Sequence, residues 1–388
     1  MEDLYYRYNP WWEKKDYRPE EAKARPKDLE AIRRSERSNR VVFITGLRRV
    51  GKSTLMKMYI SELIGAGTVK PSRVFYVSLD DYRLSKKSLL DMVEDFRKIH
   101  GLSHKDPVRL FLDEVTYQES FALQIKNLFD AGAVRIVASS SSASLLCADL
   151  HLLTGRRMTH EVLPLDFSGY LRFREITTSK GDPHLLDRHF EDFLLTGGIP
   201  EFVLHKEMDY LKDLVDDIIR KDIASHYKVR DVHLLMDYFL LLMERAGKAL
   251  SINKAARILG ISPDSARRYL DMFEETYLVH TIRRRGKTNE RLLSPKKVYA
   301  SDLGIRTLFT GVRDKGSLFE NYVFLKIKHR NPEYIYQDST ELDFFTEDGT
   351  LLEAKFGSIL TPAQETLFKA YPAKARAVIA SRQDAERL

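Results

Sequence analysis

One octapeptide constrains the fold of this chain more than any other feature. Residues 46–53, Gly-Leu-Arg-Arg-Val-Gly-Lys-Ser, match the pattern G-x-x-x-x-G-K-[ST]. The apolar run VVFIT precedes the octapeptide, and the helical pattern TLMKMYISEL follows it. Strand, glycine-rich turn and helix in this order predict a phosphate-binding loop, because glycines let backbone N–H groups wrap a phosphate and the helix N-terminus adds its positive end.

The octapeptide and the threonine after it therefore predict a site for ATP with Mg²⁺. Lys52 is expected to reach the β- and γ-phosphates, and Ser53 is expected to bind the metal ion. The residues predicted to line this nucleotide site are Gly46, Leu47, Arg48, Arg49, Val50, Gly51, Lys52, Ser53 and Thr54.

A second apolar run ends in two carboxylates, in the sequence RLFLDE at residues 109–114. Asp113 is placed to bind Mg²⁺ directly or through water. Glu114 is placed to orient or deprotonate the water that attacks the phosphate. Two acids after a strand are also common in solvated loops, so this prediction depends on the phosphate-binding loop beside it.

Two further polar side chains are candidates for the same site. The apolar run 134–138 ends in four serines, and we predict that Ser140 contacts the γ-phosphate or the water. The alternative is an ordinary serine-rich loop. Arg156 could reach a phosphate of its own chain or of a neighbouring subunit, as an arginine finger does. The alternative is an ordinary surface arginine.

The order of apolar runs predicts an α/β architecture at the N-terminal end. Candidate strands at 41–45, 74–78, 108–112 and 134–138 alternate with helical stretches, which favours a parallel sheet covered by helices on both faces. After about residue 171 the pattern becomes mostly helical, and a β-rich tail follows a basic segment. We predict an ATPase domain with its leader at 1–175, a helical linker or lid at 176–230, a third domain at 231–300 and a fourth at 301–388.

Several stretches resemble one family of proteins. They are GLRRVGKST, VFYVSLDD, RLFLDEV, the serine run, GRRMTHEVLPLDFSGYL, TGGIPEF, KVYASDLGIR, FENYVFLKI and ELDFF…LLEAK. Together they resemble archaeal and bacterial P-loop ATPases close to the AAA+ and STAND groups, whose C-terminal half is a domain of unknown function. The family usually has a Thr-Gly pair before its serines, where this chain has Ala138-Ser139. The resemblance implies a P-loop NTPase fold, then a winged helix and a restriction-endonuclease-like domain.

The segment from Glu244 to Ala300 carries 13 basic and 6 acidic residues, a net charge of +7. This net charge equals that of the whole chain. Within it, a helix, a glycine-containing turn and a second helix beginning at Pro263 predict a helix-turn-helix, with two wing strands at 278–285 and 296–300. A basic winged helix suits the phosphates of DNA. The alternative is that the wing only packs on the ATPase domain. The predicted DNA contacts are Arg267, Arg268, Arg283, Arg284, Arg285 and Lys287.

Acidic side chains and a lysine near the C-terminus follow the order found in restriction-endonuclease-like nucleases. Such carboxylates hold Mg²⁺ or Mn²⁺, which activates water. A three-residue hairpin loop at 347–349 would place Asp343 opposite Glu353, whereas a two-residue loop would put them on opposite faces. The alternative is a degenerate nuclease fold used for binding. The predicted metal ligands are Glu320, Asp343 and Glu353, with Lys355 as the catalytic lysine.

Composition excludes several other classes. The single cysteine, Cys147, excludes an intrachain disulfide framework and any multi-cysteine zinc site. The N-terminal residues lack the apolar core of a secretory signal, and the longest apolar stretch is too short to span a bilayer. We expect a cytoplasmic protein that binds ATP and ADP, contacts DNA rather than membrane, and could form a homo-oligomer.

The sequence therefore predicts a Mg²⁺-dependent ATPase that binds DNA through a basic winged helix, with a metal-dependent nuclease site in its C-terminal domain. The alternative is a nucleotide-switch signalling ATPase in which the C-terminal domain is an inactive docking module.

Overall fold

The structure is a computed structural model, and it describes residues 1–388 except 15, 20–21, 144–149, 178–181 and 313. Cys147 lies outside the described residues. The chain divides into two compact units, Met1–Val162 and Leu163–Leu388. The finer boundaries predicted at residues 175, 230 and 300 stay predictions.

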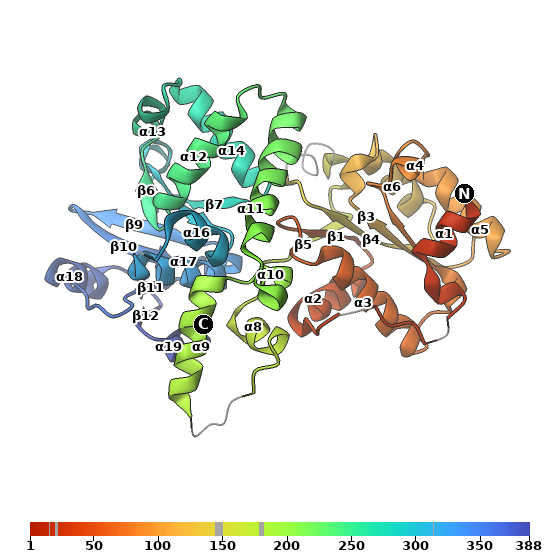
Figure 1. The fold of residues 1–388 in the computed structure, drawn as a ribbon, viewed down its shortest axis with the longest axis horizontal. Coiled ribbons are helices and arrows are strands. Elements are labelled where there is room, and N and C mark those ends of the chain that lie inside the picture. Colours follow the sequence, from red (N-terminus) through yellow and green to blue (C-terminus); the bar gives the residue numbers. More distant parts are fainter. Residues whose placement is uncertain (15, 20–21, 144–149, 178–181, 313) are drawn as a thin grey trace. The chain divides into compact units, whose positions relative to one another are not determined.

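The first unit is built on a five-stranded parallel sheet with the strand order β2-β3-β4-β1-β5 (Figure 1). Its elements are α1 (Glu2–Tyr8), η1 (Pro10–Trp12), α2 (Pro26–Arg37), β1 (Val41–Thr45), α3 (Lys52–Gly65), η2 (Pro71–Arg73), β2 (Val74–Ser78), α4 (Tyr82–Ser85), α5 (Leu89–Ile99), β3 (Val108–Asp113), η3 (Val115–Tyr117), α6 (Phe121–Asp130), β4 (Val134–Ser140), η4 (Leu150–Leu153) and β5 (Arg157–Glu161).

Helices cover both faces of this sheet, as the sequence predicted. Alternate strand residues such as Phe43 and Leu110 share one buried core with α1, α5 and α6. On the other face the ring of Tyr59 in α3 lies against that of Phe111 in β3, with 6.2 Å between centroids. Strands that are buried on both sides need nearly continuous apolar sequence, which the runs at β1 to β4 have. β5 reads Arg-Met-Thr-His-Glu, and this polar edge strand gave no such signal.

The N-terminal leader covers the exposed edge of strand β2. The Asn9 side chain donates to the carbonyl oxygen of Tyr76 at 2.9 Å and accepts from the Tyr76 N–H at 2.7 Å, as a neighbouring strand would. The indoles of Trp11 and Trp12 both donate to the carbonyl oxygen of Val74. The leader therefore satisfies backbone groups that an edge strand otherwise leaves open.

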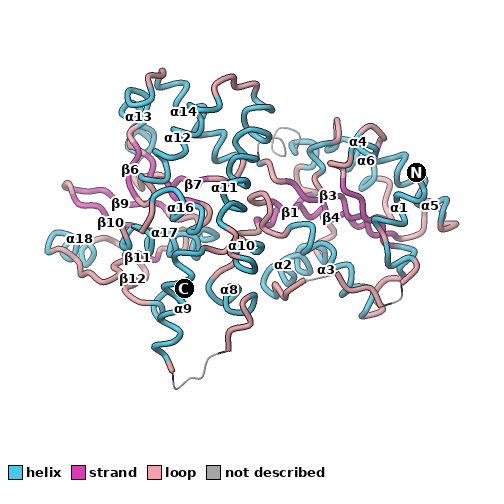
Figure 2. The backbone as a smooth tube through the Cα atoms, in the orientation of Figure 1, coloured by secondary structure: helices cyan, strands magenta, loops and turns pink. Residues whose placement is uncertain are grey.

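The second unit contains two sheets and most of the helices (Figure 2). Its elements are α8 (Phe167–Phe173), α9 (Pro183–Thr196), α10 (Pro200–His205), α11 (Met208–Asp217), the π-helix η5 (Ile218–Ser225), α12 (Val232–Glu244), β6 (Lys248–Leu250), α13 (Ile252–Leu259), α14 (Pro263–Glu275), β7 (Val279–Ile282), α15 (Thr288–Leu293), β8 (Lys296–Ala300), α16 (Leu303–Thr310), α17 (Lys315–Ile327), η6 (Lys328–Arg330), β9 (Glu333–Gln337), β10 (Thr340–Phe345), β11 (Thr350–Ala354), α18 (Pro362–Ala370), β12 (Ala375–Ile379) and α19 (Arg382–Glu386).

One sheet is antiparallel with the order β6-β8-β7, and the other is mixed with the order β12-β11-β10-β9. The two meet where the chain leaves β7, because the backbone of Arg283 and Arg285 exchanges hydrogen bonds with Tyr334 of β9. The predicted second helix of the helix-turn-helix is α14, with Ser262 as its N-cap and Pro263 at its first position. The short helix α15, at the tip between β7 and β8, was not predicted.

Buried Asp302 joins two of the motifs that carry the family resemblance. Its carboxylate accepts from the N–H of Ile305 at the start of α16 and from the N–H of Gly198 at 2.6 Å. A Cβ on Gly198 would lie 2.1 Å from the carbonyl oxygen of Leu165, so only glycine fits this close approach. Burial raises the pKa of Asp302 to about 6, although these N–H donors act in the opposite direction. The TGGIPEF and KVYASDLGIR motifs therefore have a packing role.

Candidate functional site: a nucleotide site in the first unit and a carboxylate cluster in the second

The loop after β1 has the backbone geometry that its glycines allow. Gly46 has a φ of +132°, and a Cβ there would lie 2.3 Å from the carbonyl oxygen of Val162. Gly51 has a φ of +93° and directly precedes α3. Both positions therefore require glycine. The loop leads into the N-terminus of a 14-residue helix, which is the arrangement that holds anions.

Lys52 is the first residue of α3, and its side chain folds back over the loop. It is 4% exposed, and its Nζ donates to the carbonyl oxygens of Gly46 at 3.1 Å and Leu47 at 3.2 Å. The same Nζ lies 3.7 Å from Glu114 Oε1. The buried ammonium thus lies between the predicted phosphate loop and the predicted water-handling acid. Ser53 and Thr54 follow in the first turn of α3.

Asp113 ends strand β3 and is almost completely buried at 2% exposed. Its Oδ2 accepts a 2.7 Å hydrogen bond from the hydroxyl of Tyr76 in β2, and its Oδ1 accepts a short one from Ser139 Oγ in β4. Burial raises the pKa of Tyr76 well above its ordinary value, and the charge of Asp113 adds to this effect. The phenol therefore keeps its proton and holds the carboxylate in place.

Glu114 adopts a left-handed backbone conformation with a φ of +52° directly after the strand. Its N–H donates to Ser139 Oγ at 2.9 Å, while its Oε2 accepts from both the N–H and the hydroxyl of Ser141 at 3.1 Å. Left-handed backbone in a glutamate costs of the order of 1 kcal/mol and is found preferentially at functional sites. The carboxylate is thus fixed beside Lys52.

The serine run lies at the end of β4, and the contact predicted between Ser140 and the γ-phosphate or the water stays a prediction. Ser140 is buried, and its hydroxyl lies 3.3 Å from Thr116 Oγ1 and accepts from the N–H of Ser142. The serines that touch the two acids are Ser139 and Ser141. Four identical residues in a row offered no signal for choosing among them, because the choice depends on where β4 ends.

Arg156 does not reach the predicted phosphate site of its own chain. β5 runs parallel to β1, and Val41 at the start of β1 pairs with Arg157. Arg156 therefore lies at the N-terminal end of the strands, whereas the phosphate loop follows their C-terminal end. The Nε of Arg156 pairs with Asp130 at 3.0 Å. A role within the same chain is thus wrong, because strands of five residues separate the two ends. A role at the site of a neighbouring subunit stays a prediction.

Arg25 contacts the phosphate loop and was missed by the sequence analysis. Its Nη1 donates to the carbonyl oxygen of Val50 at 2.5 Å, and its Nε pairs with Asp28 at 2.8 Å. Asp28 in turn lies 3.0 Å from His160 Nε2 in β5. Nothing in the local sequence of the leader marks Arg25, because its role depends on where α2 packs.

The predicted carboxylates in the second unit lie together. The N–H of Thr346 donates to Thr350, and that of Gly349 donates back to Thr346, which closes a three-residue loop. With Phe344 opposite Leu352, this register places Asp343 opposite Glu353. The predicted hairpin is confirmed, and Gly349 supplies the left-handed residue with a φ of +88°.

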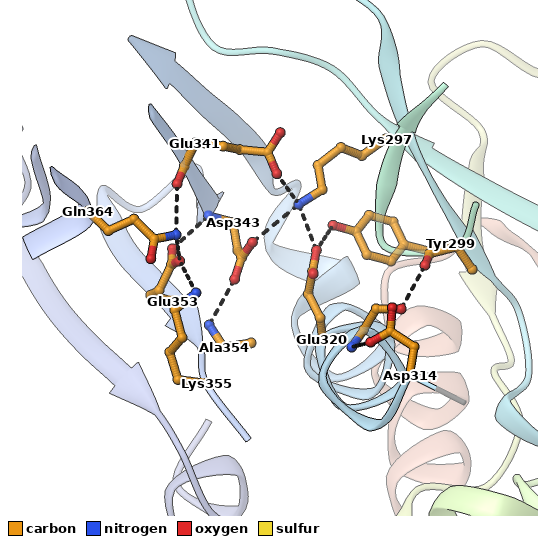
Figure 3. A network of polar contacts seen from close by, with 12 residues as sticks. Lys297, Tyr299, Asp314, Glu320, Glu341, Asp343, Glu353, Ala354, Lys355 and Gln364 are labelled. Carbon is orange, nitrogen blue, oxygen red and sulfur yellow. Dashed lines mark hydrogen bonds and ion pairs between the residues drawn. The ribbon is translucent and has the colours of Figure 1, made fainter. Parts of the chain in front are cut away.

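Each of these carboxylates already has partners in the protein (Figure 3). Glu353 accepts from the N–H of Asp343 and from Gln364 Nε2, and its Oε1 lies 3.0 Å from Lys355 Nζ. Burial, together with the charge of Asp343, raises the pKa of Glu353 to about 8 and that of Glu320 to about 7. Glu320 and Asp343 both bind Lys297, a residue that the sequence analysis missed.

The metal site predicted at Glu320, Asp343 and Glu353 is not supported. Across the described residues, no group of three or more histidine, cysteine or acidic side chains is arranged to hold a metal ion. The physical reason is that an ammonium and backbone N–H groups occupy the carboxylate oxygens.

The predicted DNA contacts fall into two groups. Arg267 and Arg268 are exposed on α14, whereas Ala266, Leu270 and Phe273 face the core as predicted. The side chains of Arg284 and Arg285 fold back onto the second unit, over the rings of Tyr336 and Phe345 respectively. Exposed Arg283 begins this arginine run, and exposed Lys287 follows two residues after its last arginine.

Arg285 also pairs with Glu333 at 3.0 Å. Arg284 and Arg285 therefore pack on strands β9 and β10 of the C-terminal sheet. The alternative that the predicted wing packs on the ATPase domain stays a prediction.

Comparisons with known proteins assign a described protein family only to the first unit and the residues just after it. Residues 38–171 match a family described as an AAA domain, and residues 187–316 match a domain of unknown function. An uncharacterized protein of Methanocaldococcus jannaschii is 26% identical over 81% of this chain and 74% of its own length. An uncharacterized protein of Haemophilus influenzae is 25% identical over 78% of each chain. Neither match extends support to a nuclease-like fold.

Solved structures of low similarity include a Walker-type ATPase of Pyrococcus abyssi, which is 14% identical over 76% of this chain and 99% of its own, with a TM-score of 0.49. The Aeropyrum pernix Orc1 protein in complex with DNA is 12% identical over 77% of this chain and 95% of its own, with a TM-score of 0.34.

Among the described residues, no helix has the length and apolar character needed to cross a membrane. The AAA-domain match at residues 38–171 includes the predicted phosphate loop and the five strands of the parallel sheet.

Proposed function

We propose that the first unit binds ATP and hydrolyses it. The observation that carries this proposal is the convergence of Lys52, Asp113 and Glu114 at the carboxyl ends of β1 and β3, with Glu114 Oε1 3.7 Å from Lys52 Nζ. The AAA-domain match over residues 38–171 supports the same assignment.

The residues present fit a nucleotide with its Mg²⁺ ion. Gly46 and Gly51 adopt positive φ angles that let the loop backbone turn tightly, and α3 begins directly after Gly51. Ser53 and Asp113 offer the oxygen ligands that Mg²⁺ prefers. When bound, the metal ion would neutralise charge that develops on the transferred phosphoryl group.

Each protein group then has a defined task. Lys52 would move its ammonium from the carbonyl oxygens of the loop to the β- and γ-phosphates, where a charge-assisted contact is stronger. Glu114, held by Ser141, would accept a hydrogen bond from the attacking water and orient it. Tyr76 and Ser139 would hold the carboxyl group of Asp113 in a fixed orientation. Nucleotide binding and phosphate release by purified protein, compared with Lys52→Ala, test this proposal directly.

A second candidate function is DNA binding by the second unit. In this proposal helices α12, α13 and α14 with the sheet β6-β8-β7 would act as a winged helix. Exposed Lys254, Arg257, Arg267 and Arg268 on α13 and α14 supply cations on one helical pair. The strongest support comes from Arg267 and Arg268 near the N-terminal end of α14. If DNA has no effect on the protein, the nucleotide-switch signalling function takes the place of this candidate.

For the C-terminal sheet we propose a structural role without metal-dependent cleavage. The support comes from the partners of its carboxylates, since Lys297, Lys355, Gln364 and two backbone N–H groups hold them. Incubation of the protein with DNA and Mg²⁺ or Mn²⁺ tests this role, because any cleavage that is lost in Glu353→Gln would contradict it.

A further inference from the structure

Lys297 lies at the centre of the carboxylate cluster of the second unit (Figure 3). It belongs to strand β8 and is fully buried. Its Nζ is 2.7 Å from Glu320 Oε1 in α17, 2.9 Å from Glu341 Oε1 in β10 and 3.2 Å from Asp343 Oδ1 in the same strand. Three carboxylates from two further elements therefore surround one nitrogen atom.

The ammonium is charged in this position. Burial alone would lower the pKa of Lys297, but Glu320, Tyr299, Asp343 and Glu341 together raise it well above its ordinary value. A buried lysine without such partners would lose its proton instead. The hydroxyl of Tyr299 completes the shell by donating to Glu320 Oε1 at 2.8 Å.

The same oxygens have the chemistry of a divalent-cation site. Carboxylates at about 2.0–2.6 Å are the usual ligands of Mg²⁺ and Ca²⁺. Here three carboxylate oxygens share one centre at distances that suit N⁺–H···O⁻ contacts. A metal ion at this centre would need the ammonium to leave, because two cations cannot occupy one position.

We propose that the ammonium of Lys297 is the resident cation of the Glu320–Glu341–Asp343 cluster, and that it keeps divalent metal ions out of this cluster. A metal site then appears only when Lys297 is replaced by a neutral residue. The ammonium also ties strand β8 of one sheet to strand β10 of the other and to helix α17. This inference concerns the second unit alone and is independent of ATP hydrolysis.

Binding of Mn²⁺ to the full-length chain, measured by electron paramagnetic resonance without nucleotide, tests the proposal. The variants are Lys297→Met, Lys297→Met combined with Glu320→Gln, Glu320→Gln alone, and Lys355→Met. Lys355→Met is the matched control, because it removes the neighbouring ammonium that contacts Glu353 and leaves Lys297 in place. Any Mn²⁺ that binds near Asp113 is common to all variants and cancels in the comparison.

The proposal predicts equal Mn²⁺ uptake by wild type, Glu320→Gln and Lys355→Met. It predicts one additional site in Lys297→Met, which disappears in the double variant. Uptake by wild type that is lost in Glu320→Gln would overturn the proposal, and so would a folded Lys297→Met without the additional site.

Removing one partner of a buried ion pair is strongly destabilising, so Lys297→Met needs a second measurement. If this variant is unfolded, restoration of its circular dichroism spectrum by Mn²⁺ supports the proposal. If Mn²⁺ does not restore the fold, the comparison between wild type and Glu320→Gln decides, since equal uptake supports the proposal and unequal uptake overturns it.

Discussion

The hydroxyl of Tyr76 donates a 2.7 Å hydrogen bond to Asp113 across neighbouring strands of the first unit. The backbone of the same tyrosine exchanges two hydrogen bonds with Asn9 of the leader. Through Tyr76, a residue near the N-terminus is thus joined to the carboxylate that we assign to Mg²⁺. The ring of Tyr76 also lies 5.3 Å from Lys57 Nζ in α3.

Removal of the Tyr76 hydroxyl should therefore weaken Mg²⁺ use. We expect Tyr76→Phe to raise the Mg²⁺ concentration for half-maximal ATP hydrolysis about tenfold, because a hydrogen bond to a charged group contributes roughly 1.5–3 kcal/mol. The measurement is the ATPase rate as a function of Mg²⁺ at saturating ATP. Tyr59→Phe is the control, since that buried phenol contacts Glu36 away from the site. Equal Mg²⁺ dependence in both variants would contradict the positioning role.

Removal of the hydrogen bonds between the leader and strand β2 should destabilise the first unit. Asn9→Ala leaves the buried N–H and carbonyl oxygen of Tyr76 without partners, which should lower the free energy of unfolding by at least ~2 kcal/mol. The chain's two tryptophans, Trp11 and Trp12, lie in this unit, so fluorescence during urea unfolding reports on it. The exposed Glu13→Ala serves as control, and an unchanged midpoint for Asn9→Ala would contradict the argument.

The carboxylate cluster should make the second unit less stable at high pH. The pKa of Glu353 is raised from its ordinary 4.5 to about 8, mainly by burial, so the folded state binds the proton more tightly than the unfolded state. This contribution is fully present below about pH 4.5 and is lost as the pH rises through about 8. Glu320 acts in the same direction with a pKa of about 7.

Glu353→Gln cannot titrate and should flatten this dependence. Urea unfolding followed by far-ultraviolet circular dichroism at pH 5 to 9 measures it, with the fluorescence transition identifying the first unit. Glu365→Gln on an exposed helix is the control. A wild-type slope equal to that of Glu353→Gln over this range would show that the buried carboxylate is not protonated.

DNA affinity, if carried by α14, should depend on Arg267 and Arg268 and fall with salt. Replacing both by alanine should reduce the slope of log affinity against log salt by up to ~0.9 for each phosphate that these arginines neutralise. Arg172→Ala with Arg220→Ala removes the same charge from other helices and should leave the slope unchanged. Arg285→Ala should act mainly on stability, because Arg285 pairs with Glu333. Equal effects of the two double variants would count against specific binding through α14.

The parts of the fold that sequence could predict are those with a local physical signature. Strands β1 to β4 are continuous apolar runs, and Gly349 permits a loop that places Asp343 opposite Glu353. Strand β5 was missed because it is polar and lies at the sheet edge. The loop glycines and Lys52 were recognised because their spacing alone defines a phosphate loop.

The rest of the candidate site depends on tertiary placement. Arg25 and Tyr76 join the nucleotide site only because α2 and β2 pack beside it. Arg156 was placed wrongly because sequence does not say which end of β5 faces the loop. Lys297 looked like one basic residue among many in the wing, whereas its burial among three carboxylates changes the interpretation of the whole cluster.

The most direct test of the central claim is the rate of ATP hydrolysis by Glu114→Gln, measured together with its affinity for ATP. The account predicts that this variant binds ATP at least as tightly as wild type, because Lys52 no longer faces an opposing carboxylate. Hydrolysis should be slower by about 10²-fold or more, because the group that orients the water is gone. A Glu114→Gln protein that hydrolyses ATP at the wild-type rate would contradict the assignment of this site.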